Sequence, residues 1–123
     1  MESVGDHGIA VSREGPDLSV VALTGEHDQY SARSLSAVLA EELENGRNLV
    51  VDLQRTIFLD STSAGALLVA DQRATASARR LVVLLTDETP TAVARLFSTA
   101  RLTTILTVVD SADAALELAR TPR

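Results

Sequence analysis

The fold is decided by residues 49–70, which read LVVDLQRTIFLDSTSAGALLVA. An apolar, β-branched run at 49–53 and a second apolar patch at 57–59 predict one interrupted strand. The polar turn 60–63 ends that strand, and apolar residues at helical spacing then predict a helix over 64–78. A strand followed directly by a helix is the unit from which parallel sheets are built.

Toward the N-terminus, the pattern predicts two more strands and another helix. Residues 9–11 and 18–23 are apolar and are separated by a Gly-Pro-Asp turn, so we expect them to pair as an antiparallel hairpin. A helical pattern begins at Ser31 and ends at Asn45-Gly46. We expect its acidic residues to face water, namely Glu41, Glu42 and Glu44.

Toward the C-terminus, strands and helices continue to alternate. Residues 81–85 are apolar without alternation, which is typical of a strand covered on both faces, and 105–109 form a last strand. Thr89 and Pro90 suit the N-cap and the first position of a helix, and Asp110 or Ser111 caps the final helix.

The whole pattern predicts an α/β protein with the element order ββαβαβαβα. We expect one domain over residues 1–123, with an ordered core at about 9–118. Its sheet should be mixed and mostly parallel, with an opening antiparallel hairpin and about four helices.

The composition excludes several classes of function. The formal net charge of -6 disfavours direct contact with nucleic acid. The chain has no cysteine, and all 11 basic residues are arginine, so thiolate metal sites, Schiff-base chemistry and a Walker-type phosphate loop are excluded. The acidic N-terminus and the lack of a long apolar run predict a cytoplasmic protein that does not enter a membrane.

Two polar turns follow strands and should lie together at the carboxyl edge of the sheet, at residues 25–28 and 60–65. Asp60 or Ser61 suits a helix N-cap, which is the simplest interpretation of this hydroxyl-rich turn. The alternative is that Ser61 accepts a phosphoryl group, whose charge the free helix amides would hold and the neighbouring carboxylates would oppose.

Catalysis by this serine is disfavoured. The possible bases are His7, in a polar terminus, and His27, and the turn lacks the Gly-x-Ser-x-Gly pattern of hydrolases. His27 lies between Glu26 and Asp28, but without a second histidine at ligand spacing we expect a solvated loop residue and no metal site. We expect no cofactor and no enzymatic activity.

A phosphoaspartate receiver domain is a further alternative. It shares the alternating elements and would use Asp52 with Thr86. The missing lysine and the absence of an acidic pair after the first strand argue against it.

Three segments together resemble the STAS domain family, which includes the bacterial anti-sigma factor antagonists. They are Leu23-Thr24-Gly25-Glu26-His27-Asp28, Val50-Val51-Asp52-Leu53 and Phe58-Leu59-Asp60-Ser61-Thr62-Ser63-Ala64-Gly65. The resemblance covers roughly Ile9 to Leu118, and its strongest part is the Asp-Ser turn between a strand and a helix.

The resemblance implies a phosphorylation switch at Ser61. The unmodified protein would bind a cognate anti-sigma factor that is a serine kinase, and so free a sigma factor. Phosphorylation would break this binding, and a phosphatase acting on phosphoserine would restore it. Asp28, Asp60, Ser61 and Thr62 match the partner-binding positions, and Thr62 and Ser63 are rival acceptors. Other STAS domains imply a different role, as scaffolds or accessory subunits of transport or stress-signalling assemblies.

The sequence also departs from the family pattern. Ser63 and Ala64 stand where Gly-Leu is common, and His27 replaces an apolar residue.

Overall fold

The computed structural model describes residues 2–4 and 8–122. Within them, six strands form one sheet in chain order. The strands are β1 (Glu2–Val4), β2 (Ile9–Arg13), β3 (Leu18–His27), β4 (Asn48–Leu59), β5 (Leu81–Leu84) and β6 (Thr107–Val109). The helices are α1 (Gln29–Glu44), α2 (Ser61–Ala76), α3 (Thr91–Thr99) and α4 (Ala112–Arg120), with a 3₁₀ turn η2 (Leu102–Thr104).

The sheet is mixed, as the sequence predicts. β1, β2 and β3 are antiparallel neighbours, whereas β3, β4, β5 and β6 run parallel. The predicted opening hairpin, the mostly parallel sheet and the four helices are therefore confirmed. β1 was not predicted, because an edge strand held by backbone pairing needs no apolar alternation.

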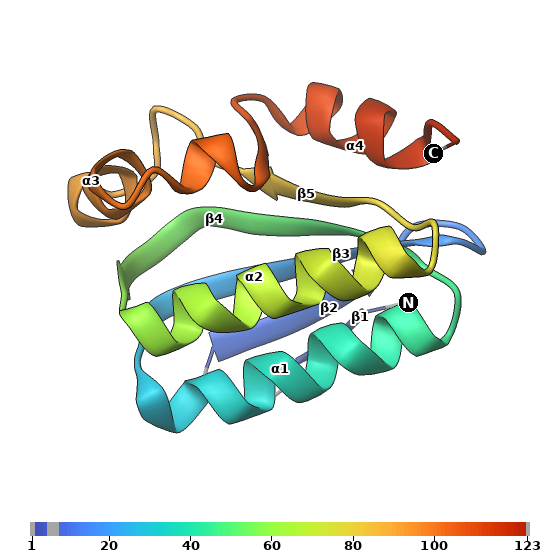
Figure 1. The fold of residues 1–123 in the computed structure, drawn as a ribbon, viewed down its shortest axis with the longest axis horizontal. Coiled ribbons are helices and arrows are strands. Elements are labelled where there is room, and N and C mark those ends of the chain that lie inside the picture. Colours follow the sequence, from blue (N-terminus) through green and yellow to red (C-terminus); the bar gives the residue numbers. More distant parts are fainter. Residues whose placement is uncertain (1, 5–7, 123) are drawn as a thin grey trace.

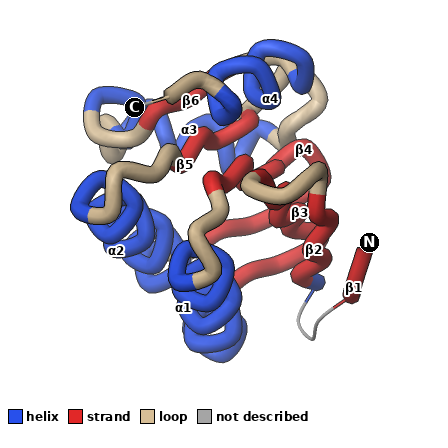
Figure 2. Tube along the Cα trace, turned by 90° about the vertical axis from the view of Figure 1, so that its right-hand side faces the viewer, coloured by secondary structure: helices blue, strands red, loops and turns tan. Residues whose placement is uncertain are grey.

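Helices cover the sheet on both faces. α1 and α2 lie side by side on one face, and α4 lies on the other (Figures 1 and 2). The larger apolar core fills the space beneath α1 and α2 and includes Leu35, Val51 and Leu67, each fully buried. A smaller core beneath α4 is built around Val82 and Ala115. No helix in the described part of the chain is both long and apolar enough to cross a membrane.

β4 is one continuous strand, although its apolar pattern is interrupted. Its register against β3 shifts between Ala22 and Thr24 and again at Gly25, so β4 carries an extra residue at each point. At the second shift, Thr56 turns inward and its hydroxyl donates to the Leu23 carbonyl at 2.9 Å. Ile57 is the residue left unpaired, and it is exposed.

Several element boundaries differ from the predicted ones. α2 begins at Ser61 rather than Ala64, because Asp60 caps it. α3 has Pro90 at its N-cap, while the Thr89 hydroxyl accepts from the Thr86 amide at 3.0 Å and closes the preceding turn. A 3₁₀ turn precedes β6, which is confined to Thr107–Val109.

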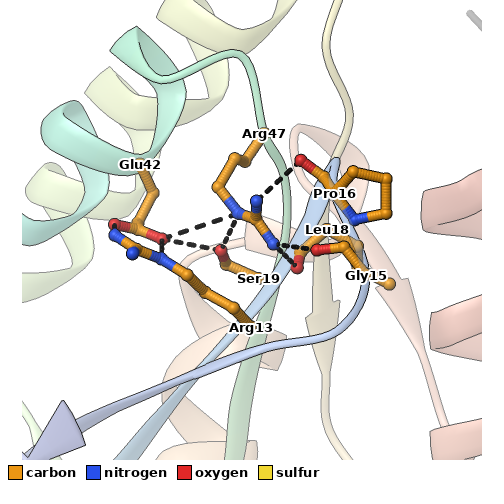
Figure 3. A network of polar contacts seen from close by, with 7 residues as sticks. All are labelled: Arg13, Gly15, Pro16, Leu18, Ser19, Glu42 and Arg47. Atoms are coloured by element: carbon orange, nitrogen blue, oxygen red, sulfur yellow. Dashed lines mark hydrogen bonds and ion pairs between the residues drawn. The ribbon is translucent and has the colours of Figure 1, made fainter. Parts of the chain in front are cut away.

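Glu42 was expected to face water, and that prediction is wrong. The residue is 3% exposed and lies in a polar network at the C-terminal end of α1 (Figure 3). Its carboxylate accepts two hydrogen bonds from Arg13, at 3.2 and 2.9 Å, and one from the Ser19 hydroxyl at 2.6 Å. The guanidinium of Arg47 lies 3.9 Å from the same carboxylate.

Arg47 joins this network to the turn between β2 and β3. It donates to the Ser19 hydroxyl and, through its two terminal nitrogens, to three backbone carbonyls. These belong to Gly15, Pro16 and Leu18. Buried charges are tolerated where such partners are present, so the network fixes the end of α1 opposite to the Ser61 turn.

Candidate functional site

The two polar turns meet at the carboxyl edge of the sheet. His27, the last residue of β3, is in register with Leu59, the last residue of β4. The Asp60 amide donates to the His27 carbonyl at 3.0 Å, and the Ser63 hydroxyl donates to the Asp28 carbonyl at 3.3 Å. The turns at 25–28 and 60–65 therefore form one bonded unit, as the sequence predicts.

Asp28 caps α1. Its carboxylate accepts from the backbone amides of Tyr30 at 2.9 Å and Ser31 at 3.3 Å. In return, the Ser31 hydroxyl accepts from the Asp28 amide at 3.1 Å, which completes a reciprocal capping box. The side chain of Asp28 is thus held at the exposed edge of the site.

Asp60 caps α2 in a similar way. Its carboxylate accepts from the Ser63 amide at 2.9 Å and from the Thr62 hydroxyl at 2.7 Å. Desolvation alone would raise the pKa of Asp60, but the hydrogen bonds from Ser63 and Thr62 outweigh it, and the pKa lies below its ordinary value. Asp60 is therefore ionised at neutral pH.

The three hydroxyls of this turn differ in exposure and in hydrogen bonding. Ser63 is fully buried and bonded to Asp28. Thr62 is exposed, but its hydroxyl proton is donated to Asp60. Ser61 is exposed, and its hydroxyl has no hydrogen bond to any residue that the structure describes. Of the three rivals, Ser61 thus presents the hydroxyl that an external reagent reaches without breaking a bond.

His27 is buried, so the prediction of a solvated loop histidine is wrong. Its Nε2 lies 3.0 Å from the Thr24 carbonyl oxygen and its Nδ1 lies 3.2 Å from the Ser31 hydroxyl. The alternation from Leu23 to His27, carried across the positive φ of Gly25, is the signal that places this ring inward. The ring supports the α1 cap from below. His7 lies outside the described residues.

The structure also bears on the receiver-domain alternative and on metal binding. Gln54 links Asp52 to Thr86, since its amide donates to the Asp52 carboxylate at 3.1 Å and accepts from the Thr86 hydroxyl at 3.5 Å. A receiver domain has the strand order 2-1-3-4-5, whereas this sheet follows chain order, so that alternative is excluded. Among the described residues, no group of three His, Cys, Asp or Glu side chains could hold a metal ion.

The fold and the site define a small mixed-sheet α/β domain with an exposed serine at the helix start on its carboxyl edge. The family model described as Mlab, STAS domain, matches residues 10–110, and the chain belongs to the STAS domain family. No curated protein matches the sequence.

Solved structures of anti-sigma factor antagonists have a similar fold. The unphosphorylated form of SpoIIAA matches with a TM-score of 0.75 at 20% identity, over 91% of this chain and 96% of that one. The phosphorylated form of SpoIIAA from Bacillus matches with a TM-score of 0.66, also at 20% identity, over 91% and 99%. An antagonist from Mycobacterium paratuberculosis matches with a TM-score of 0.76 at 21% identity, over 97% and 100%. At these identities the likeness establishes the fold.

Proposed function

We propose that the protein is an anti-sigma factor antagonist controlled by phosphorylation of Ser61. Unmodified, it binds a cognate anti-sigma factor that is also a serine kinase, and a sigma factor is released. Phosphorylation of Ser61 ends this binding, and a phosphatase restores it. The observation that carries the proposal is the exposed, unbonded Ser61 hydroxyl beside two hydroxyls that are already engaged.

The charges around Ser61 support a switch that acts without refolding. A phosphoserine carries a charge of about -1.5 to -2 at neutral pH. The free amides at the start of α2 stabilise such a charge, while the Asp28 and Asp60 carboxylates oppose it. The added charge therefore changes a surface that Asp28, Asp60, Ser61 and Thr62 present to a partner, and leaves the core untouched.

The same geometry supports a binding role rather than catalysis by Ser61. A catalytic serine needs a base within hydrogen-bond reach. The His27 ring instead contacts the Thr24 carbonyl and the Ser31 hydroxyl beneath the site. As part of the proposal, the switch operates in the cytoplasm through protein partners, without direct contact with nucleic acid or membrane.

The test is labelling by a candidate anti-sigma factor kinase from the same organism with ATP. We expect one phosphate per chain, mapped to Ser61 by mass spectrometry, and no labelling of Ser61→Ala. Thr62→Ala is the control for the acceptor, because it removes the neighbouring exposed hydroxyl of the same turn, and the phosphate should still map to Ser61. Equal labelling of wild type and Ser61→Ala would refute the assignment.

A second candidate is an accessory subunit that is not phosphorylated. It is favoured by the description of the matching family model, which names Mlab rather than an anti-sigma factor antagonist. Such a subunit, in a transport or stress-signalling assembly, would bind its partner with the same affinity in wild type and in Ser61→Asp. A large loss of affinity in Ser61→Asp supports the switch instead.

A further inference from the structure

A groove runs between the exposed faces of α1 and α2, starting beside the Ser61 turn. Its first part has a volume of about 220 Å³ and begins at Thr62, and its second part has about 320 Å³ and reaches Ser77. Ala40 and Arg73 line both parts, so they form one continuous groove. From Thr62 to Ser77 a helix rises roughly 22 Å, which is about four helical turns.

The groove exists because small residues face each other across the two helices. Its floor in the first part is lined by Ser36, Ala40, Gly65, Ala66 and Ala70. The rim carries Val69, an aliphatic side chain that is 49% exposed. Small side chains and an exposed apolar rim make a concave surface suited to larger apolar side chains from another molecule.

Among the residues that line this part of the groove, Gly65 is the one whose residue type the fold does not explain. A glycine inside a helix destabilises it by about 0.5–1 kcal/mol relative to alanine. Gly65 has no positive φ that requires glycine, and a Cβ built on it would meet no atom within 4 Å apart from its chain neighbours and the backbone of its own helix. The space above Gly65 is therefore open, and Gly65 lines the groove, so an occupant can approach the α2 backbone closely at this point.

Arg73 gives the groove a charge preference. It lies where the two parts meet, and its guanidinium has no ion pair with any residue of the described part of the chain. Glu44, which lines only the second part, is likewise without an ion pair there. Since Glu44 lines only the second part, Arg73 is the one charged residue that lines the first part, and its guanidinium is complementary to a carboxylate on an occupant of that part.

We propose that the α1/α2 groove is a docking site for an amphipathic helix of the partner protein, with aliphatic side chains over Gly65 and a carboxylate against Arg73. This inference rests on the proposed function in one respect: the occupant is taken to be the partner protein whose binding is controlled by phosphorylation of Ser61. Because the groove opens at Thr62, a phosphate on the adjacent Ser61 lies at its mouth, where its bulk and charge alter the end of the docking surface that an occupant meets.

The experiment uses two synthetic helical peptides of about 18 residues with leucine at helical i, i+4, i+7 and i+11 spacing. They differ in carrying glutamate or lysine beside the leucine stripe. Binding to the full chain is measured by fluorescence anisotropy, and the site is mapped by amide chemical shifts. We expect the glutamate peptide to bind about tenfold more tightly than the lysine peptide and to shift the amides of the groove.

Three variants distinguish specific binding of the peptides in the groove from non-specific adsorption to the protein. Arg73→Glu should reverse the preference between the peptides, whereas Arg95→Glu on α3 changes the same charge elsewhere and should not. Gly65→Leu should fill the groove and abolish binding of both peptides, with retention of the fold checked by thermal denaturation. Equal binding of the peptides, binding that survives Gly65→Leu, or a dimer that Gly65→Leu dissociates would each overturn the proposal.

The outcome is separable from that of the Ser61 assignment. Peptide binding is measured on unphosphorylated protein, so Arg73-dependent binding without any labelling of Ser61 overturns the proposed function alone. Labelling of Ser61 without peptide binding in the groove overturns the docking site alone.

Discussion

Glu42 shows how a single side chain acquires its role from partners distant in the sequence. The pKa of Glu42 lies below its ordinary value, first because Arg13 donates hydrogen bonds to it, although burial acts in the opposite direction. The Ser19 hydroxyl and the charge of Arg47 lower it further. A carboxyl group whose pKa is lowered by folding stabilises the folded state only while it is ionised.

We therefore predict that Glu42→Gln is less stable than wild type by roughly 1.5–3 kcal/mol at pH 7. The difference should be fully present above the unfolded pKa of about 4.3 and should shrink as the pH falls through the lower folded pKa. Urea denaturation between pH 7 and pH 3 measures it. Glu41→Gln, on the exposed neighbour, is the control and should change stability little at any pH; a Glu42→Gln deficit independent of pH would contradict the prediction.

The residues that the sequence misplaced are polar residues whose burial is decided by tertiary contacts. Glu42 lies in an acidic run whose other members are exposed. No neighbouring residue in the sequence indicates that Arg13 and Ser19 contact it. His27 is buried by the helix that follows it. Asp60 is the N-cap of α2, one of the two caps that the sequence predicted, and it was predictable because a cap residue bonds to its neighbours in the chain.

At the scale of elements, the α2 cap can be tested by itself. We predict that Asp60→Ala lowers the free energy of unfolding by about 1 kcal/mol, because the Ser63 amide loses its acceptor. Asp60→Asn keeps a side-chain oxygen at the cap and should lose much less. Chemical denaturation of the three proteins compares them, and equal losses in both variants would show that the cap bond does not determine the effect.

Strand and helix order was predictable, whereas boundaries and irregularities were not. Apolar periodicity reports which face of an element is buried, and it identified β2 to β6 and all four helices. The extra residues in β4 broke that periodicity, so the one strand predicted there had an interruption that the structure does not show. α3 begins one residue later than predicted, with Pro90 as its N-cap, and the Thr89 hydroxyl bonds to the Thr86 amide instead of to the helix amides.

For the molecule as a whole, the proposed switch requires that charge at Ser61 leave the fold intact. We predict that Ser61→Glu changes the free energy of unfolding by less than about 1 kcal/mol, since the helix dipole favours the new charge and Asp60 opposes it. Circular dichroism and thermal denaturation test this. Ser61→Gln is the uncharged control of similar size, and a loss of cooperative unfolding specific to Ser61→Glu would contradict a switch confined to the surface.

The fold class followed from the sequence because alternating strands and helices permit few arrangements. The opening hairpin and the parallel part of the sheet both agree with the pattern. The groove between α1 and α2 was not predictable, because it depends on which small residues of the two helices face each other. Gly65 and Ala40 are unremarkable in the sequence and become informative once the helices are adjacent.

The strand order of the sheet also bears on how the chain is made. Every strand pairs with its immediate neighbours in the sequence, so no strand waits for a segment synthesised much later. The buried residues of the core beneath α1 and α2 run from Ile9 to Leu106, so all of them have been translated before β6 and α4 on a chain emerging from the ribosome. The smaller core beneath α4 is completed last.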